Sequence, residues 1–427
     1  MVNYQDCVTD SVFILPRGAE LGGITTWSVR MAKRLKDADE PVALIKHREM
    51  NGAKHDDISL DGLSIVKCPG KPAWSVRLND IISYVPAYHS SLPGLLIPNW
   101  TFGTYATCAL LSLTESQRMR VLGVAHSDED IYYDWLSYYE PIIHTFVAVS
   151  DEIAANLKTL MPHRVEDILI RPCSVIDSPP TLSRSYSAAK HPIRLMYAGR
   201  IQNQQKRIYD LLILAKMMKR RHLDFQLDFF GSGSDESWLR QQFEKFLGAD
   251  DSQTVTFNGN VPHADMAGYW EKADICVLVS DFEGTSISML EAMSHGCVPV
   301  VTDVSGTKAV IQDGVNGLIV PIGNMSSMTD CIESLINDRQ KLEEMGRAAY
   351  LSVADKYSFE NYMTWFLTMR QAIWNKPPRQ WPLGRTLLPE KFQPKPPPSL
   401  SERAMNKAKR MTDKARLSLK IRGVLGR

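Results

Sequence analysis

Short apolar runs alternate with longer stretches of helical periodicity from residue 11 to about residue 175. The runs are rich in Val, Ile and Leu, which is typical of strands buried on both faces of a parallel sheet. Helical segments separate them, so the pattern predicts a doubly wound α/β domain. The expected strands are residues 11–16, 42–46, 63–66, 95–97, 121–125 and 145–149.

A second alternating region follows a break in composition. Residues 178–191 are rich in Pro and Ser and poor in apolar residues, which indicates a linker. Apolar runs then resume and predict a second domain of the same class over residues 192–376, after a first domain over residues 1–177. From residue 377 to residue 427 we expect a Pro-rich linker and a basic helical tail. The expected strands of the second domain include residues 193–198, 225–230, 275–279 and 298–301.

One stretch of the second domain, residues 274–303, has the pattern of a strand, a loop, a helix and a further strand. Thr285 or Ser286 is a suitable N-cap, so we expect the helix to begin directly after Glu283. Its first backbone N–H groups then face the space beyond the strand, where an anion is stabilised. Glu291 lies within this helix among apolar residues, and a carboxylate in such surroundings needs a partner.

The two carboxylates bracket the predicted helix N-terminus. A nucleotide diphosphate sugar fits this arrangement, with its diphosphate on the N–H groups, its ribose on one carboxylate and its sugar hydroxyls on the other. A structural ion pair is the alternative, in which Glu291 contacts a nearby cation such as Lys308.

Composition and cysteine usage are those of an ordinary globular protein. The chain has 427 residues, of which 44% are hydrophobic and 23% charged, enough for two or three domains. Its seven cysteines are scattered and form no CxxC pair, which favours a reducing compartment and argues against a zinc site. Residues 1–10 lack a basic targeting segment, and prolines interrupt the uncharged stretch 90–114, so we expect a cytoplasmic protein without a membrane span.

Charge is unevenly distributed along the chain. Residues 376–427 contain fourteen Lys or Arg against three acids, a net +11, so the remainder carries about −10 of the total of +1. A weak apolar stripe accompanies the basic residues from 399 to 427, which predicts a peripheral contact with an anionic membrane face. A solvated end is the alternative, and sparse aromatic residues argue against nucleic acid.

The segment from Glu283-Gly284 through Glu291-Ala292-Met293 to Gly296 resembles the E-x7-E segment of retaining glycosyltransferases of the GT-B fold, in the family 4 group. The resemblance extends over about residues 1–375 and implies two Rossmann-like domains facing across a cleft. It implies that Glu283 contacts the donor sugar, that the backbone of Gly284, Thr285 and Ser286 contacts sugar and phosphate, and that Glu291 holds the ribose.

Two cations follow the first strand of the second domain. Arg200 and Lys206 flank the carboxyl end of that strand. They resemble the family's pair that neutralises the donor diphosphate, whose charge grows as the glycosidic bond breaks. Val261 lies in a segment resembling the loop that holds the nucleobase.

The loop Gly22-Gly23 follows the first strand of the chain and precedes a helix, so its backbone can approach a ligand closely. The alternative is a simple turn. The family has a glycine-rich loop here that contacts the donor diphosphate, which favours a donor-binding role for Gly22 and Gly23.

His126 follows the strand 121–125, at the sheet edge where open α/β folds bind ligands. The resemblance implies that its ring or backbone approaches the donor sugar, and a loop-capping role is the alternative. Asp128 and Asp130 have DxD spacing, but we interpret them as helix N-terminal charges because the family needs no metal. The aromatic residues from Tyr132 to Tyr139 could stack on an acceptor or pack into the core.

Together with the resemblance, these features predict a glycosyltransferase with Glu283, Arg200, Lys206 and His126 as catalytic residues, and the resemblance implies that it is a retaining enzyme. It would transfer a sugar from a nucleotide diphosphate donor to a glycan or lipid-linked acceptor, without a cofactor or metal. A nucleotide-sugar epimerase and a non-catalytic glycan- or nucleotide-binding protein on the same scaffold are the alternatives.

Overall fold

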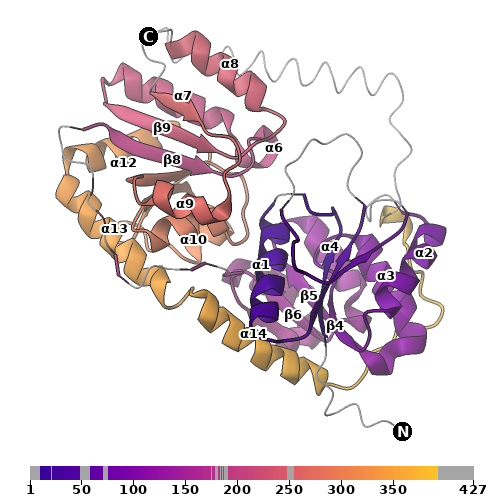
Figure 1. Ribbon diagram of the computed structural model, residues 1–427. Helices are drawn as coiled ribbons and strands as arrows, with labels where there is room; N and C mark the ends of the chain where they lie inside the picture. The colour runs from indigo at the N-terminus through magenta and orange to yellow at the C-terminus, as the bar shows by residue number, and fades with distance from the viewer. Residues whose placement is uncertain are drawn as a thin grey trace, which may run out of the picture.

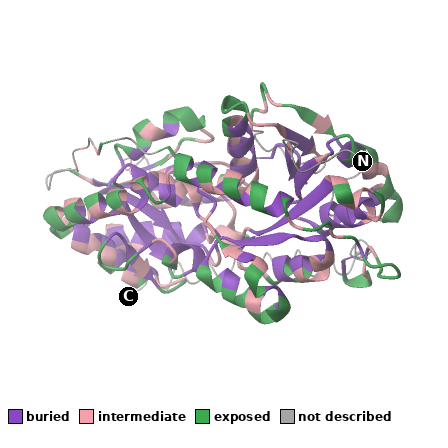
Figure 2. Cartoon of the chain, turned by 90° about the horizontal axis from the view of Figure 1, so that it is seen from below, coloured by how far each residue is buried: buried purple, intermediate pink, exposed green. Residues whose placement is uncertain are grey.

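The computed structural model describes residues 10–20, 22–48, 58–70, 76–174, 176–177, 181–182, 184, 186, 191–247 and 254–392. These residues form two α/β domains, each built on a parallel sheet with helices packed against it (Figure 1). The central strands of both sheets are buried, whereas the outward faces of the surrounding helices are exposed (Figure 2). The predicted fold class is therefore confirmed.

The first sheet has seven strands in the order β3-β2-β1-β4-β5-β6-β7. All neighbours are parallel; for example, Ser11 pairs with Val42 on one side and with Leu95 on the other. The strands are β1 (Asp10–Leu15), β2 (Val42–Lys46), β3 (Ile65–Lys67), β4 (Gly94–Ile97), β5 (Met119–Ala125), β6 (Thr145–Ala148) and β7 (Ile168–Ile170). β3 begins two residues later than predicted because a turn precedes it, with Gly62 at a φ of 76°.

The second sheet has six strands in the order β10-β9-β8-β11-β12-β13. They are β8 (Ile193–Ala198), β9 (Phe225–Phe230), β10 (Val255–Phe257), β11 (Ile275–Leu278), β12 (Val298–Thr302) and β13 (Leu318–Val320). In each sheet the strand order reverses once, between β1 and β4 and between β8 and β11. Open α/β sheets bind their ligands beyond the carboxyl ends of the strands at such points.

The helices follow the predicted alternation. Those of the first domain are α1 (Gly23–Asp37), α2 (Leu78–His89), α3 (Phe102–Glu115), α4 (Asp130–Tyr138) and α5 (Asp151–Leu160). Those that follow are α6 (Asn203–Lys206), α7 (Tyr209–Arg220), α8 (Glu236–Leu247), α9 (His263–Trp270), α10 (Ile287–Ser294), α11 (Ser305–Lys308), α12 (Met325–Asn337), α13 (Arg339–Ala354) and α14 (Phe359–Trp374). Arg207 has a φ of 46° and separates α6 from α7.

Each domain has its own hydrophobic core, and α14 belongs to the core of the first. Phe359, Tyr362 and Phe366 pack among the residues of that core, although they follow the whole second domain in sequence. The backbone N–H of Phe359 donates to the carbonyl of Ile176 at 3.0 Å, and Ser358 forms a parallel bridge with Ile176. The chain therefore passes between the domains twice, and the two crossings lie side by side.

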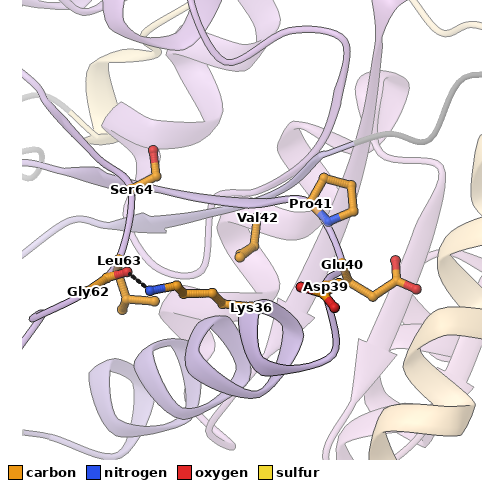
Figure 3. Close-up of a pocket in the computed structure, with 8 residues that line it drawn as sticks. All are labelled: Lys36, Asp39, Glu40, Pro41, Val42, Gly62, Leu63 and Ser64. Atoms are coloured by element: carbon orange, nitrogen blue, oxygen red, sulfur yellow. Dashed lines mark hydrogen bonds between the residues drawn. The ribbon is translucent and has the colours of Figure 1, made fainter.

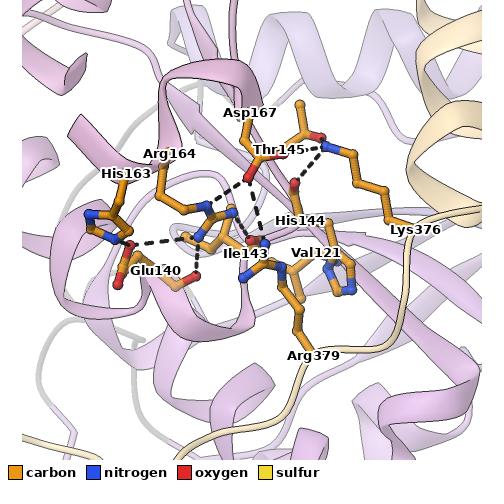
Figure 4. A network of polar contacts seen from close by, with 10 residues as sticks. All are labelled: Val121, Glu140, Ile143, His144, Thr145, His163, Arg164, Asp167, Lys376 and Arg379. Atoms are coloured by element: carbon orange, nitrogen blue, oxygen red, sulfur yellow. Dashed lines mark hydrogen bonds and ion pairs between the residues drawn. The ribbon is translucent and has the colours of Figure 1, made fainter. Parts of the chain in front are cut away.

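Residues 377–392 differ from the expected linker. Trp381, Leu388 and Phe392 are buried in the first core, where the Phe392 ring stacks on Phe102 of α3 and the Trp381 ring packs against Tyr138 of α4. A polar network holds the start of this segment (Figure 4). Lys376 Nζ donates to Asp167 Oδ1 at 2.7 Å and to the carbonyl of His144 at 2.9 Å. The predicted basic helix over 399–427 lies outside the described residues.

Candidate functional site

An ion pair lies at the point where the strand order of the second sheet reverses. Lys206 Nζ, at the end of α6, is 2.5 Å from Glu283 Oε1 in the loop after β11. The Ser280 hydroxyl donates to the same carboxylate oxygen at 2.6 Å. Both side chains of the pair are largely buried, at 17% and 7% exposure, so their charges interact with little screening by water. Two residues predicted to act together, 77 positions apart, are thus in contact.

Arg200 lies beside this pair and is oriented by its neighbours. Its guanidinium donates to Gln205 Oε1 at 3.2 Å, and its carbonyl accepts a bond from the Tyr197 hydroxyl at 2.7 Å. The Gln205 amide donates in turn to the carbonyl of Phe282 at 3.1 Å. Arg200 is therefore tied to the loop that carries Glu283, and three charged groups converge at one sheet edge.

The backbone after Glu283 contacts the first domain. An ideal Cβ built on Gly284 would lie 1.8 Å from the carbonyl oxygen of His126, so only glycine fits there. A Cβ on Gly306 would lie 1.5 Å from the Gly284 carbonyl oxygen, so the loop is enclosed on its other side as well. The Thr285 hydroxyl accepts a bond from the backbone N–H of Cys173 at 2.9 Å. Thr285 thus joins the two domains.

Helix α10 begins after Ser286, as the N-cap prediction required, although no side-chain capping bond forms there. Its buried apolar residues include Met289, Leu290 and Met293. The helix ends before Gly296, whose φ of 72° is the left-handed conformation typical of a helix C-terminus. The first turn of α10 therefore lies at the domain junction, next to Glu283.

Glu291 is paired, but not with Lys308. Its Oε1 lies 2.7 Å from an Arg30 nitrogen on α1 and 3.4 Å from His263 Nδ1 on α9. Lys308 instead lies 3.1 Å from Asp303 and 3.4 Å from Glu152, because its side chain projects from α11 at the protein surface. The Arg30–Glu291 pair connects the two domains.

The His126 ring is packed and held in place. Its Nε2 is 3.1 Å from Asn99 Oδ1, its Nδ1 is 3.7 Å from Cys173 Sγ, and its ring centre is 5.3 Å from that of Trp27. Burial lowers the pKa of His126 to about 3, so its imidazole is neutral at physiological pH. Its backbone carbonyl, rather than the ring, faces Gly284.

Two charged residues near Arg200 were missed by the sequence analysis. The Arg17 guanidinium lies over the Trp100 ring, 5.3 Å from its centre, and 3.0 Å from Glu20. Burial lowers the pKa of Arg17, and the positive charge of the nearby Arg200 lowers it further, whereas Glu20 opposes this shift. Glu129 is the other residue; burial raises its pKa, and the nearby Arg200 charge opposes this shift. The sequence pointed to Arg17 and Glu129 only through their positions after strands β1 and β5.

Gly22 and Gly23 open helix α1 at the carboxyl end of β1. A Cβ at either position would meet no atom of the described residues within 4 Å. Packing among the described residues therefore does not demand glycine at these positions, and none of those residues fills the space beside the helix N-terminus. Val261 lies in the loop between β10 and α9 and packs partly against the second core.

The Asp128-x-Asp130 motif takes part in the packing of α4. Asp128 accepts hydrogen bonds from the Tyr133 hydroxyl and from Asn156, while Asp130 lies in the first turn of the helix. In the part of the chain that the structure describes, no group of three or more His, Cys, Asp and Glu residues is arranged to hold a metal ion. Tyr132, Tyr133 and Trp135 are buried, which supports a packing role for these aromatic residues.

A hollow in the first domain lies away from these residues (Figure 3). It is lined by residues near the end of α1 and the start of β2, including Lys36, Val42 and Gly62. The Lys36 side chain crosses this hollow, and its Nζ donates a hydrogen bond to the Gly62 carbonyl at 2.5 Å. This is the amino-terminal edge of the sheet, opposite to the edge where such folds bind ligands.

Comparisons with known proteins agree with this geometry. Residues 192–338 match the family model of glycosyl transferases group 1. Alpha-D-kanosaminyltransferase of Streptomyces kanamyceticus is 31% identical over 178 residues, which is 42% of this chain and 45% of that protein. Poly(glycerol-phosphate) alpha-glucosyltransferase of Bacillus subtilis is 30% identical over 150 residues, 35% of this chain and 21% of that protein. The chain therefore spans less than half the length of these curated relatives.

The fold extends this similarity to most of the chain. The crystal structure of Anabaena HepE in complex with UDP and glucose superposes with a TM-score of 0.67 and 13% identity, covering 85% of this chain and 100% of that one. The chain thus has the GT-B architecture, and the matched family region contains Arg200, Lys206, Glu283 and Glu291. Within the described ranges, none of the helices combines the length and apolar character needed to cross a bilayer.

Proposed function

We propose that this protein is a retaining glycosyltransferase of the family 4 type. It would transfer a sugar from a nucleotide diphosphate donor to a glycan or lipid-linked acceptor, in polysaccharide or glycoconjugate biosynthesis. The observation that carries the proposal is the Lys206–Glu283 pair, with Arg200 beside it, at the reversal point of the second sheet. These charges match the needs of a donor with an anionic leaving group and a polyhydroxylated sugar.

In the proposed reaction, the bond between the sugar C1 and the diphosphate oxygen breaks, and a bond forms between C1 and an acceptor hydroxyl oxygen on the same face. The acceptor proton passes to the leaving phosphate, so no protein nucleophile is required. Arg200 and Lys206 stabilise the charge that grows on the diphosphate. Glu283 releases Lys206 to the phosphate and accepts hydrogen bonds from the sugar hydroxyls.

The remaining donor groups have candidate partners around this centre. Glu291 would accept hydrogen bonds from the ribose, and Val261 would contact the nucleobase. The backbone of Gly284, Thr285 and Ser286 would contact sugar and phosphate, while the open space beside Gly22 and Gly23 would admit the diphosphate. The His126 ring is neutral and held by Asn99, so we assign its contact with the sugar to the backbone or to a neutral imidazole.

The acceptor is expected on the side of the first domain. Alpha-D-kanosaminyltransferase and poly(glycerol-phosphate) alpha-glucosyltransferase are named for different sugars, and only the second name gives an acceptor, so these relatives select neither for this chain. The proposed donor is a nucleotide sugar, for which HepE bound to UDP and glucose is the structural precedent.

Substitution of the ion pair tests this function. Glu283→Gln and Lys206→Ala should each lower turnover by about two to four orders of magnitude, because each removes an electrostatic contact at the transition state. Turnover is measured as nucleotide released from UDP-, GDP- and ADP-sugars in the presence of acceptor. Lys308→Ala is the matched control, since it removes a lysine from an exposed pair at the same domain junction.

Near-normal turnover in both variants, with the control unchanged, would refute the assignment. Absence of nucleotide release from every donor, with binding retained, would favour a non-catalytic glycan- or nucleotide-binding protein. Conversion of the donor sugar without release of nucleotide would favour an epimerase.

We also propose that residues 399–427 attach the protein to the inner face of an anionic membrane. Residues 399–427 contain nine Lys or Arg against two acids, a net +7, which supports this, since each Lys or Arg near such a surface contributes about 1 kcal/mol. The full chain should sediment with anionic vesicles at low salt, and a chain stopped at Pro398 should not. Equal binding of the two chains, or binding insensitive to salt, would refute the attachment.

A further inference from the structure

The Arg30 guanidinium is paired with the Glu291 carboxylate, the group that would bind the donor ribose in the proposed function. Arg30 lies on α1 in the first domain and Glu291 on α10 in the second, with 2.7 Å between their nearest nitrogen and oxygen atoms. The two helices lie on the facing sides of the two domains (Figure 1). The exposures of the two side chains are only 16% and 13%, so solvent screens the pair weakly.

Other contacts surround the pair and hold the same two surfaces together. The Thr285 hydroxyl accepts a bond from the Cys173 N–H, and Gly284 packs on the His126 carbonyl. Ile287, in the first turn of α10, packs against the cores of both domains. Backbone and side-chain groups of both domains therefore meet beside the Arg30–Glu291 pair.

We propose that Arg30 is a latch that competes with the nucleotide donor for Glu291. In the free protein, its guanidinium binds the carboxylate and keeps the domains in contact. When a nucleotide enters, the ribose hydroxyls replace the guanidinium and the latch opens. This inference rests on the ribose role of Glu291 in the proposed function, and it assigns Arg30 a part in controlling access to that site.

The competition has a measurable size. A nucleotide binds only the unlatched fraction of the protein, so the apparent dissociation constant is the intrinsic constant divided by that fraction. If about one molecule in ten is unlatched, removal of the latch tightens binding by about tenfold. A residue that merely assisted nucleotide binding would have the opposite effect when removed.

Two measurements on the full chain test the latch. The first is the affinity for UDP, GDP and ADP by calorimetry, and the second is the radius of gyration of the nucleotide-free protein by X-ray scattering. The variants are Arg30→Gln, Glu291→Gln and their combination, with Arg30→Lys as a conservative substitution. Arg34→Gln is the matched control: Arg34 lies one turn further along α1 and makes an exposed pair with Asp177 at 2.5 Å.

Arg30→Gln should bind nucleotide several-fold to tenfold more tightly and have a larger radius of gyration. Glu291→Gln should show the same expansion but weaker nucleotide binding. The double variant should expand no further than either single variant, since both substitutions remove the same contact. Arg30→Lys should fall between wild type and Arg30→Gln, and Arg34→Gln should resemble wild type in both measurements.

Unchanged or weaker nucleotide binding in Arg30→Gln, with Glu291→Gln impaired, would overturn the latch and leave the proposed function in place. Unchanged nucleotide binding in Glu291→Gln would instead refute the ribose role, and with it the competition. The scattering measurement needs no nucleotide, so an unchanged radius in Arg30→Gln also overturns the latch. A cooperative thermal transition in each variant is the control for correct folding.

Discussion

Gly284 gives the most direct test of the domain junction, because a single methyl group should separate function from folding. In Gly284→Ala, the new Cβ would lie 1.8 Å from the His126 carbonyl oxygen and 3.0 Å from a Val149 methyl carbon. Cβ atoms in real proteins essentially never approach another heavy atom to less than 3.0 Å, so the loop must retreat by about 1.2 Å. Gly306 lies behind the loop and limits that retreat.

The displaced loop carries Glu283 and the first N–H groups of α10. A shift of about 1 Å in positioning groups can cost about 100-fold in rate, which corresponds to about 2.7 kcal/mol in the transition-state free energy. We therefore expect kcat/KM for the best donor of the UDP-, GDP- and ADP-sugar panel to fall by about 100-fold. The thermal transition of the second domain should shift little, since Gly284 is at its edge.

Gly268→Ala is the control for the substitution itself. Gly268 lies within α9, where a Cβ would meet no described atom within 4 Å, and alanine in a helix is favoured over glycine by about 0.4–1 kcal/mol. This variant should keep wild-type kcat/KM and be slightly more stable. Wild-type kcat/KM in Gly284→Ala would show that the two domains do not meet at His126 during turnover, and the reasoning from the junction would fail.

Three further predictions concern stability and metals. Burial lowers the pKa values of His47 and His126 to about 3 and of His144 to about 2, so the unfolded chain takes up these protons first. The free energy of unfolding should therefore fall as the pH decreases from about 6.5 towards 3, by up to about 1.4 kcal/mol per histidine per pH unit. In His144→Asn, the urea midpoint should change less steeply with pH than in the wild type. Trp381→Ala should destabilise the first domain by about 3–5 kcal/mol in urea unfolding, whereas Leu383→Ala, at a 91% exposed side chain, should not; equal effects would contradict the packing. EDTA should leave turnover unchanged because Arg200 and Lys206 supply the charge at the diphosphate, and activity restored by manganese would contradict this.

Much of the fold could be predicted because buried parallel strands leave a direct signature. The runs at β1, β2, β5 and β8 are mostly apolar, and their ends are marked by Pro16, Lys46, His126 and Gly199, so their carboxyl ends could be located. Residues that follow those ends on one sheet, such as Arg200 and Glu283, could therefore be expected to lie near each other.

Contacts between the domains could not be predicted in this way. The pairing of Arg30 with Glu291 depends on how two separate sheets are oriented, and neither helix encodes that orientation in its periodicity. The same holds for Arg17 and Glu129, which approach Arg200 only across the junction. Residues 377–392 were missed for another reason: their prolines indicated a linker, while three separated apolar side chains anchor the segment.

The side-by-side crossings near Ile176 and Ser358 make the second domain an insertion within the first. Its two ends emerge at one point, which is the arrangement in which an inserted module disturbs its host least. A gene cut once between the domains would separate α14 from the first sheet, and Trp381 and Phe392 from α3 and α4, so the first part would lose a side of its hydrophobic core. An exchange of the second domain between related proteins must therefore replace the middle of the chain and join it at two places. The segments before and after it then remain together as the first domain.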